Sequence, residues 1–381
     1  MGEGPLTGVR VVELAGLGAA PFCGMVLADL GADVIRIDRS DQVTGGHTSS
    51  TRHDLHGRGK RSIGVDLKQA AGTDIVLRLS STAELFLEGF RPGVTERLGI
   101  GPAQLLAQNH ALVYGRMTGW GQNGPLSGRA GHDIDYIALS GALHGVGTPH
   151  APAVPLNLVG DYGGGGMLLA VGLLAALLHA RSTGEGQVVD AAMLDGSALL
   201  TTSLHGYMAE GFWTPERAAN LLDGSAPFYS VYETADAKHV AVGALEPQFY
   251  AVLLEALDID PSSLGEQTDR QRWPEMRAKL EARFLERSRA EWDEVFAGLD
   301  ACVAPVLAPD EAPNHRHNRD RELFVEIDGV VQPAPAPRFS VTSTSKPEAP
   351  VFPGRDTDAI LHSLGLTKED TSKLRQVGAV A

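Results

Sequence analysis

Residues 9–39 have the sequence VRVVELAGLGAAPFCGMVLADLGADVIRIDR, and this stretch decides the fold class. The apolar residues 9–15 have the length of a buried strand, and residues 21–30 have the composition of a helix that Gly31 ends. A second apolar strand follows at residues 33–37. Strand, helix and strand in this order predict a βαβ unit, whose two strands lie parallel in one sheet.

The same alternation continues through the first 200 residues. Further strands are expected at residues 83–87, 111–114 and 187–191, and helices at residues 69–79, 167–180 and 193–208. Because alternating strands and helices form parallel sheets covered on both faces, we predict an α/β fold with a Rossmann-like, doubly wound sheet.

The composition changes after residue 224, where Tyr, Trp and Arg become frequent, and again after residue 328, where proline accumulates. Helical patterns within the second stretch, at residues 249–257 and 273–284, precede an apolar segment at residues 301–307. We therefore predict a large domain, a linker, a smaller α+β domain, and a proline-rich linker with a C-terminal segment, at residues 1–200, 201–224, 225–328 and 329–381.

The overall charge restricts the partners. The chain has 381 residues, of which 47 are acidic and 32 basic, so its formal net charge is −15. Because this charge repels nucleic acid and anionic lipid, neither is expected as a partner. Apolar residues make up 43% and charged residues 21%, which is typical of a folded globular protein.

Cysteine usage and apolar runs indicate the compartment. Cys23 and Cys302 are the only cysteines and have no neighbours at metal-ligand spacing, so neither a disulfide framework nor a metal site is expected. Residues 1–8 lack the pattern of an export leader, and the apolar run at residues 167–178 is shorter than a membrane span. We expect a cytoplasmic protein with no membrane partner.

The loop after the first strand, Gly16-Leu17-Gly18-Ala19-Ala20-Pro21, begins like a dinucleotide-binding fingerprint. Pro21 stands where the third glycine is needed for close packing of the helix, so NAD and FAD are not expected. A turn from strand to helix that glycine makes possible is the simpler interpretation.

Three arginines follow predicted strand ends, where open α/β sheets bind ligands. Arg39 follows the second strand, while Arg91 and Arg97 lie beyond the strand at residues 83–87. Guanidinium groups that converge there would suit phosphate groups. Each arginine taken alone is also compatible with an ordinary solvated surface charge.

The segment Gly131-His132-Asp133 opens an apolar helical run. A helix start offers free backbone N–H groups to an anion such as an enolate oxygen, and histidine titrates near neutral pH. The alternative is a helix-capping turn with a surface histidine.

Two further acids lie at expected helix starts. Asp161 precedes four consecutive glycines, which are conformationally costly unless something approaches the backbone closely. This favours a functional role over simple capping. Glu246 lies just before a helix of the small domain, where it would also serve as an ordinary first-turn acid.

Several of these motifs occur together, and in the same order, in one known family. The chain resembles the α-methylacyl-CoA racemases within the class III CoA-transferases, and the resemblance covers nearly its whole length. The matching segments are GVRVVEL, DLGADVIRIDR, RPGV, MTGWGQ, GHD, GD, GQVVDAAM and GALEPQF, which begin at residues 8, 29, 91, 117, 131, 160, 186 and 243.

The resemblance implies an interlocked homodimer whose C-terminal tail returns to the large domain, with each chain threading through the other. It also implies an acyl-CoA substrate, so that CoA is not a separate cofactor and no metal is needed. The residues that match the family's CoA contacts are Arg39, Val65, Asp66, Leu67, Lys68, Gly89, Phe90, Arg91, Arg97, Gly131, Asp133, Ile134, Asp135 and Tyr136.

By the same resemblance, His132 and Asp161 are the acid/base pair on opposite faces of the α-carbon, serving the (S)- and (R)-substrates respectively. The enolate oxygen would bind backbone N–H near Asp133, and Glu246 of the partner chain would orient His132. The resemblance thus implies an isomerase that interconverts (R)- and (S)-2-methylacyl-CoA. One alternative is a CoA-transferase that forms an acyl anhydride on Asp161, and another is an acyl-CoA-binding protein without catalysis.

Overall fold

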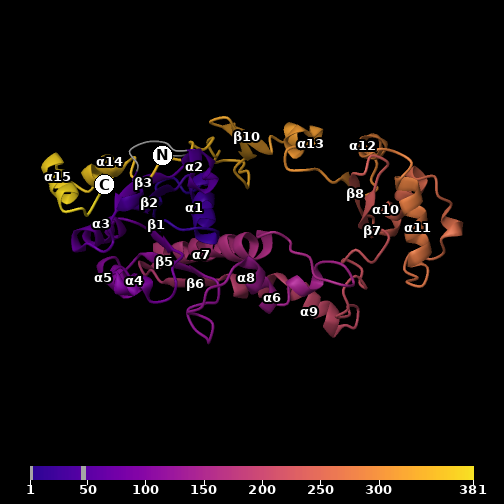
Figure 1. The fold of residues 1–381 in the computed structure, drawn as a ribbon, viewed down its shortest axis with the longest axis horizontal. Helices are drawn as coiled ribbons and strands as arrows, with labels where there is room; N and C mark the ends of the chain where they lie inside the picture. The colour runs from indigo at the N-terminus through magenta and orange to yellow at the C-terminus, as the bar shows by residue number, and fades with distance from the viewer. Residues whose placement is uncertain (1–2, 44–48) are drawn as a thin grey trace. The chain divides into compact units, whose positions relative to one another are not determined.

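The computed structural model describes residues 3–43 and 49–381, and the chain forms two compact units (Figure 1). The first unit contains the residues up to Ser140, together with Leu156–Leu200 and His317–Ala381. The second contains Gly141–Pro155 and Thr201–Arg316. The second unit thus starts earlier in the sequence than the small domain expected at residues 225–328, and it ends earlier.

Hydrogen bonds explain why residues 141–155 belong to the second unit. The Arg217 side chain donates to the carbonyl oxygens of Thr148 and His144, at 2.8 and 2.7 Å. A ring nitrogen of His144 lies 2.8 Å from the carbonyl oxygen of Pro215. Nothing in the local sequence pattern indicated these long-range contacts.

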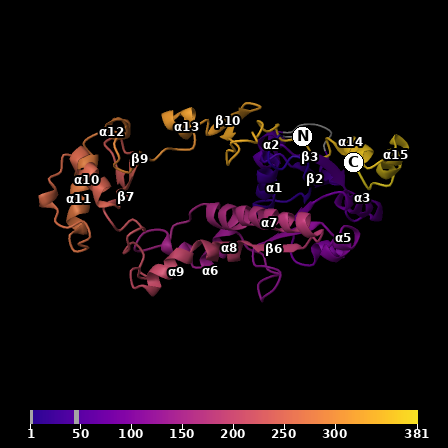
Figure 2. The same ribbon diagram turned by 180° about the vertical axis from the view of Figure 1, so that it is seen from behind.

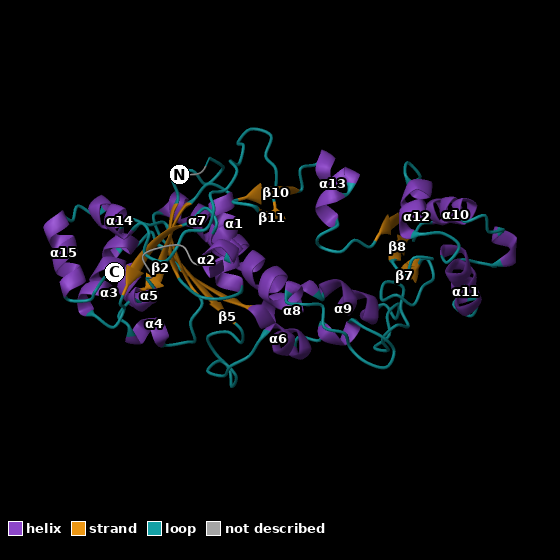
Figure 3. Ribbon diagram, turned by 45° about the horizontal axis from the view of Figure 1, so that its top comes forward, coloured by secondary structure: helices purple, strands orange, loops and turns teal. Residues whose placement is uncertain are grey.

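A six-stranded parallel sheet is the centre of the first unit (Figure 3). Its strand order is β3-β2-β1-β4-β5-β6, and every neighbouring pair is parallel. The strands are β1 (Arg10–Leu14), β2 (Asp33–Arg39), β3 (Arg61–Val65), β4 (Leu85–Glu88), β5 (Val113–Thr118) and β6 (Val188–Ala192). This arrangement confirms the predicted doubly wound α/β fold.

Helices cover both faces of this sheet, and consecutive residues of β1 face opposite layers. Val11 packs in one apolar cluster with α1 (Ala19–Asp29) and α7 (Leu168–Thr183). Val12 packs on the other side with residues of the helices α3 (Ala70–Ser81), α5 (Pro102–Gln108) and α14 (Thr357–Ser363). Complete burial of each such side chain contributes about 1.5–3 kcal/mol, so the two layers fix the sheet.

The C-terminal residues of the first unit complete the layer beside β3. Val380 forms an antiparallel bridge with Val65, and the backbone N–H of Ala381 donates to the carbonyl oxygen of Gly64 at 3.1 Å. Figure 2 shows α14 and the C-terminus next to the strand labels β2 and β3. The other helices and strands of this region are α13 (Arg316–Asp320), β10 (Phe324–Ile327), β11 (Val330–Pro333) and α15 (Lys368–Gln376).

The second unit is a smaller α+β body with its own aromatic core. Its antiparallel sheet has the order β7 (Tyr229–Glu233), β8 (His239–Gly243), β9 (Val303–Pro305). Tyr232, Phe284 and Trp292 are buried between this sheet and its helices. The helices are α9 (Thr202–Ala209), α10 (Pro247–Ala256), α11 (Trp273–Phe284) and α12 (Arg289–Phe296).

One helix, Leu158–Thr183, is longer than its apolar run suggested. The helix has 26 residues, and an 18-residue window within it has a mean hydropathy of 1.7, so it meets the length and composition of a membrane span. Half of that apolar stretch is buried, and Leu169 and Leu173 are part of the same core as α1 and the sheet. This packing is that of a core helix in a layered α/β fold.

Candidate active site

Two cavities meet where the strand order reverses, at the carboxyl ends of β1 and β4. Open α/β sheets bind ligands at this point because the loops that follow the two strands diverge there. The first cavity has a volume of about 600 Å³, and the second has about 290 Å³. Leu17, after β1, and Phe90, after β4, line both.

The first cavity lies beyond β1, β2 and β3. Of the residues expected to contact CoA, it is lined by Arg39, Val65, Leu67 and Phe90. Arg39 is 69% exposed, and its Nε donates to Asp41 Oδ1 at 3.0 Å. The predicted neighbours Asp66 and Lys68 do not line the cavity.

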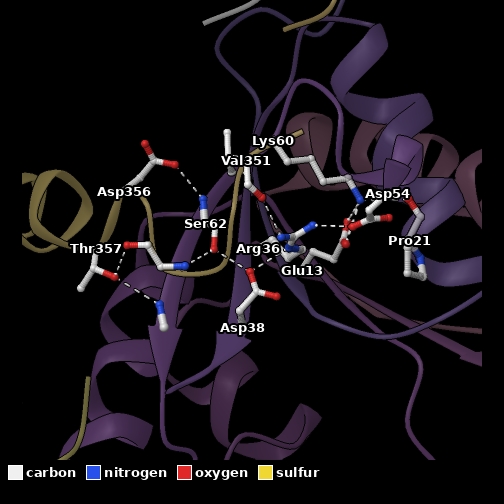
Figure 4. Close-up of polar contacts among 12 residues, drawn as sticks. Glu13, Pro21, Arg36, Asp38, Asp54, Lys60, Ser62, Val351, Asp356 and Thr357 are labelled. Carbon is white, nitrogen blue, oxygen red and sulfur yellow. Dashed lines mark hydrogen bonds and ion pairs between the residues drawn. The ribbon is translucent and has the colours of Figure 1, made fainter. Parts of the chain in front are cut away.

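A charged network forms one wall of this cavity (Figure 4). Lys60 Nζ lies 2.6 Å from Glu13 Oε2, and both side chains are almost completely buried. Arg36 is also buried, with its Nε 2.8 Å from Asp38 Oδ2 and its Nη1 3.1 Å from Asp54 Oδ2. Sequence analysis did not predict this network, which depends on residues far apart in the chain.

The second cavity is lined by several of the remaining predicted residues. It is lined by Gly89, Phe90, Arg91, Gly131, His132 and Tyr136, together with Trp120 and Met193. Arg97, in the short helix α4 (Val94–Arg97), is exposed and lies outside both linings. Trp120 packs edge-to-face on Tyr136 with 4.7 Å between ring centroids, an arrangement that aromatic pairs favour.

His132 is the N-cap residue of α6 (Asp133–Leu139). Its backbone N–H donates to Asp135 Oδ2 at 2.9 Å, which fixes the helix start, and its side chain is exposed. Ile134 and Asp135 are exposed, whereas Asp133 and Tyr136 are buried. The capping turn is therefore observed, and the same turn places His132 in the lining of the second cavity.

Asp161 lies on a π-helix, η4 (Leu158–Met167), that continues into α7. Its backbone N–H donates to Asp133 Oδ1 at 2.6 Å, and its Oδ2 accepts from Asn157 Nδ2 at 3.2 Å. Burial raises the pKa of Asp161; the Asp133 charge adds to this rise, while Asn157 and His132 oppose it. Sequence analysis did not identify Asn157 or the role of the Asp133 side chain.

The glycines after Asp161 allow neighbouring helices to pack against the π-helix. A Cβ at Gly166 would lie 2.6 Å from a ring carbon of Phe22 in α1. A Cβ at Gly164 would lie 2.7 Å from the backbone nitrogen of Ser197 in α8 (Met193–Leu200). The close approach inferred from the sequence is thus made by the protein's own helices.

The loop after β1 also reaches Asp161. Gly18 has φ = +73°, and a Cβ there would lie 3.5 Å from Asp161 Oδ2. The positive φ favours glycine and turns the chain from β1 into α1 beside the carboxylate. This location accounts for the incomplete glycine fingerprint without any dinucleotide.

Glu246 belongs to the second unit, where it is the exposed N-cap residue of α10. Its charge raises the pKa of the Cys302 thiol, after the larger effects of partial burial and of Asp300. Within residues 3–43 and 49–381, no three His, Cys, Asp or Glu side chains are grouped as metal ligands would be.

The sequence matches one family over most of its length. Residues 6–357 match the model of CoA-transferase family III, and the chain belongs to this family. Mouse α-methylacyl-CoA racemase is 44% identical over 373 residues, which cover 97% of this chain and 96% of the relative. The human α-methylacyl-CoA racemase is 43% identical over 378 residues, with the same coverage.

A solved structure supports the same assignment. A CaiB/BaiF family protein from Brucella suis superposes with a TM-score of 0.82 at 25% sequence identity, covering 95% of this chain and all of that protein. The family resemblance inferred from the sequence motifs is confirmed.

Proposed function

We propose that this chain is an α-methylacyl-CoA racemase, which interconverts (R)- and (S)-2-methylacyl-CoA thioesters. The observation that carries the proposal is the proximity of two acid/base groups at the end of the sheet. His132 lines the second cavity, and its charge acts on Asp161. The backbone N–H of Asp161 donates to the side chain of Asp133, the residue that follows His132. The similarity to mouse and human racemases over nearly the whole chain supports the same chemistry.

The reaction then needs two proton transfers at one carbon. One group removes the α-proton as the thioester becomes an enolate, and the other delivers a proton to the opposite face. A positioned acid or base typically accelerates such a step by about 10²- to 10⁴-fold. The direction of the pKa shift of Asp161 suits this role, because a raised pKa makes its carboxylate a stronger base.

The two cavities suggest how acyl-CoA would bind. The nucleotide would occupy the larger cavity beside Arg39, while pantetheine would pass Phe90 and bring the thioester to His132. The enolate oxygen would accept from the backbone N–H of Asp133 at the start of α6. We propose no other cofactor.

In this proposal, Glu246 takes part in the active site only when the protein is a dimer. It would come from the partner chain of an interlocked homodimer and orient His132. Co-refolding of His132→Ala and Glu246→Ala chains tests this arrangement, since hybrid dimers would contain one intact site. No recovery of activity from two inactive variants would refute the shared site.

The proposed reaction is tested with (R)- and (S)-2-methylacyl-CoA in deuterated water. Racemisation should incorporate deuterium at the α-carbon and yield the opposite enantiomer without a free-acid acceptor. The alternative within CoA-transferase family III is a CoA-transferase, in which Asp161 would be the nucleophile. CoA transfer to an added acid without α-deuterium would establish that alternative, and binding without either reaction would indicate a non-catalytic acyl-CoA-binding protein.

A further inference from the structure

The Asp133 side chain connects the start of α6, where His132 lies, to η4, which contains Asp161. Asp133 follows His132 on α6, and its Oδ1 accepts the backbone N–H of Asp161 on η4 at 2.6 Å. A single carboxylate therefore connects the start of one helix to the turn that carries the other group. Because proton transfer is sensitive to displacements of about 1 Å, such a contact has a direct chemical consequence.

The surroundings of Asp133 are shaped around its carboxylate. The residue is 6% exposed, and a Cβ at Gly160 would lie only 2.5 Å from its Oδ1. Its Oδ2 is enclosed and has no hydrogen-bond partner within residues 3–43 and 49–381. Burying a carboxylate oxygen without a hydrogen-bond partner costs free energy. An asparagine at position 133 would still offer an oxygen to accept the Asp161 N–H, without carrying a charge.

An asparagine at position 133 would lack the negative charge that Asp133 places beside Asp161. The groups from neighbouring elements that act on Asp161 are His132, Asp133 and Asn157. Tyr136 of α6 also interacts electrostatically with Asp161. The other acids on elements packed against η4 are engaged elsewhere or exposed: Asp135 of α6 accepts the His132 N–H, and Asp29 of α1 pairs with Arg58. Asp195 of α8 is exposed, and Asp190 of β6 accepts the Gln122 N–H. A Cβ added at Gly165 or Gly166 would meet Ala19, Phe22 and the backbone of Cys23 in α1, none of which carries a charge.

We infer that Asp133 is a positioning residue for the proposed racemisation: its Oδ1 fixes the Asp161 backbone, and its carboxylate places a negative charge beside the Asp161 carboxyl group. This inference rests on the proposed function, since it assigns a role to a residue beside the two acid/base groups. The two parts of the role separate in two variants. Asp133→Asn keeps the acceptor and removes the charge, whereas Asp133→Ala removes both.

The first test measures α-deuterium exchange from each enantiomer as a function of pH. Asp161 must be deprotonated to remove the α-proton of the (R)-substrate. When the pKa of Asp161 is raised, this exchange is lost at a higher pH as the solution is acidified. Removing the Asp133 charge lowers that pKa, and the acidic limb for (R) should move to lower pH in Asp133→Asn. Asp133→Ala should lose about 10- to 100-fold in rate, mainly in kcat. An unmoved limb in Asp133→Asn would overturn the electrostatic role.

The second test does not depend on activity. Hydrogen exchange of the peptide containing the Asp161 amide should remain slow in Asp133→Asn and become faster in Asp133→Ala. Gly160→Ala, whose Cβ would displace the carboxylate, should also accelerate it. The matched control Gly163→Ala meets its nearest atom, Leu158 O, at 3.1 Å and should have a smaller effect. Equal protection in the wild-type and Asp133→Ala proteins would overturn the positioning role.

The two tests distinguish this inference from the proposed function. A wild-type protein without α-exchange would refute the racemase assignment, while the amide measurement would still test the contact. A wild-type protein with α-exchange whose Asp133 variants have unchanged rates, pH profiles and amide protection would refute this inference alone.

Discussion

Buried acids occur in two different settings in the first unit. Around the larger cavity they are paired with cations: Glu13 with Lys60 and Asp38 with Arg36. At the start of η4, the backbone N–H of the half-buried Asp161 donates to Asp133 Oδ1. Neither acid has a Lys or Arg partner among the described residues. Breaking a paired buried charge costs stability, whereas Asp161, whose pKa is raised by burial, is suited to proton transfer.

The packing of the paired region reinforces this difference. A Cβ at Gly24 would lie 1.7 Å from Glu13 Oε2, so α1 approaches the carboxylate as closely as glycine allows. Lys60 Nζ also donates to the carbonyl oxygen of Pro21 at 2.9 Å. The pair therefore joins β1, α1 and the segment before β3 in one contact (Figure 4).

The largest effect is expected from breaking the Glu13–Lys60 pair. Lys60→Met leaves the buried Glu13 carboxylate without its cation, and we expect a loss of about 3–5 kcal/mol in unfolding free energy. The measurement is native-state hydrogen exchange of the β1 amides in both proteins.

Two controls sharpen this prediction. The double variant Glu13→Met/Lys60→Met removes both charges and should recover most of the stability. Arg78→Met breaks an exposed pair with Asp74 and should cost less than about 1 kcal/mol. If Lys60→Met is no less stable than Arg78→Met, the buried pair does not hold the first unit together.

Substitutions of His132 and Asp161 should change the catalytic rate more than the stability of the protein. His132→Ala should suppress α-deuterium exchange from the (S)-substrate more than from the (R)-substrate, and Asp161→Ala should show the reverse bias. Epimerisation needs both groups and should fall by about 10²-fold or more in each variant. The readout is deuterium incorporation into each enantiomer, with thermal unfolding followed in parallel.

Asp195→Asn is the matched control, because it removes an exposed acid from α8 beside the π-helix. It should keep near-normal exchange from both faces. Identical residual exchange from both enantiomers in His132→Ala and Asp161→Ala would contradict the two-base assignment. A protein that transfers CoA normally after His132→Ala would instead favour the transferase alternative.

The two settings also differ in how far the sequence predicted them. The apolar pattern of residues 9–39 was sufficient for β1, α1 and β2, because short buried strands leave local composition signatures. β3, with the sequence RSIGV, was missed because polar residues interrupt its pattern. Its Arg61 pairs with Asp33 on β2, a contact that only the assembled sheet provides.

The candidate site was predicted from motifs, and its contacts were not. His132 and Asp161 were identified by their neighbours in sequence, but the bond between Asp133 and Asp161 joins residues 28 positions apart. The four glycines indicated a close approach without showing that α1 and α8 make it. Local patterns specify which side chains an element presents, whereas tertiary packing decides what those side chains contact.

The smallest effect concerns Arg39, a charge that belongs to neither setting. It lines the larger cavity, but it is 69% exposed and already paired with Asp41. A phosphate of CoA would have to replace that exposed partner, so Arg39→Ala should weaken CoA binding by about 1.5 kcal/mol, the lower end for a charge-assisted contact.

Calorimetric titration of CoA at two salt concentrations measures this loss, and the loss should shrink at high salt because the site is exposed. Asp41→Asn offers the complementary variant: it frees the guanidinium group and should strengthen CoA binding at low salt. If Arg39→Ala and Asp41→Asn both bind CoA as the wild type does, Arg39 is a solvated surface charge. If both change in the expected directions, the first cavity combines a buried, internally neutralised wall with one exposed cation that remains available to the ligand.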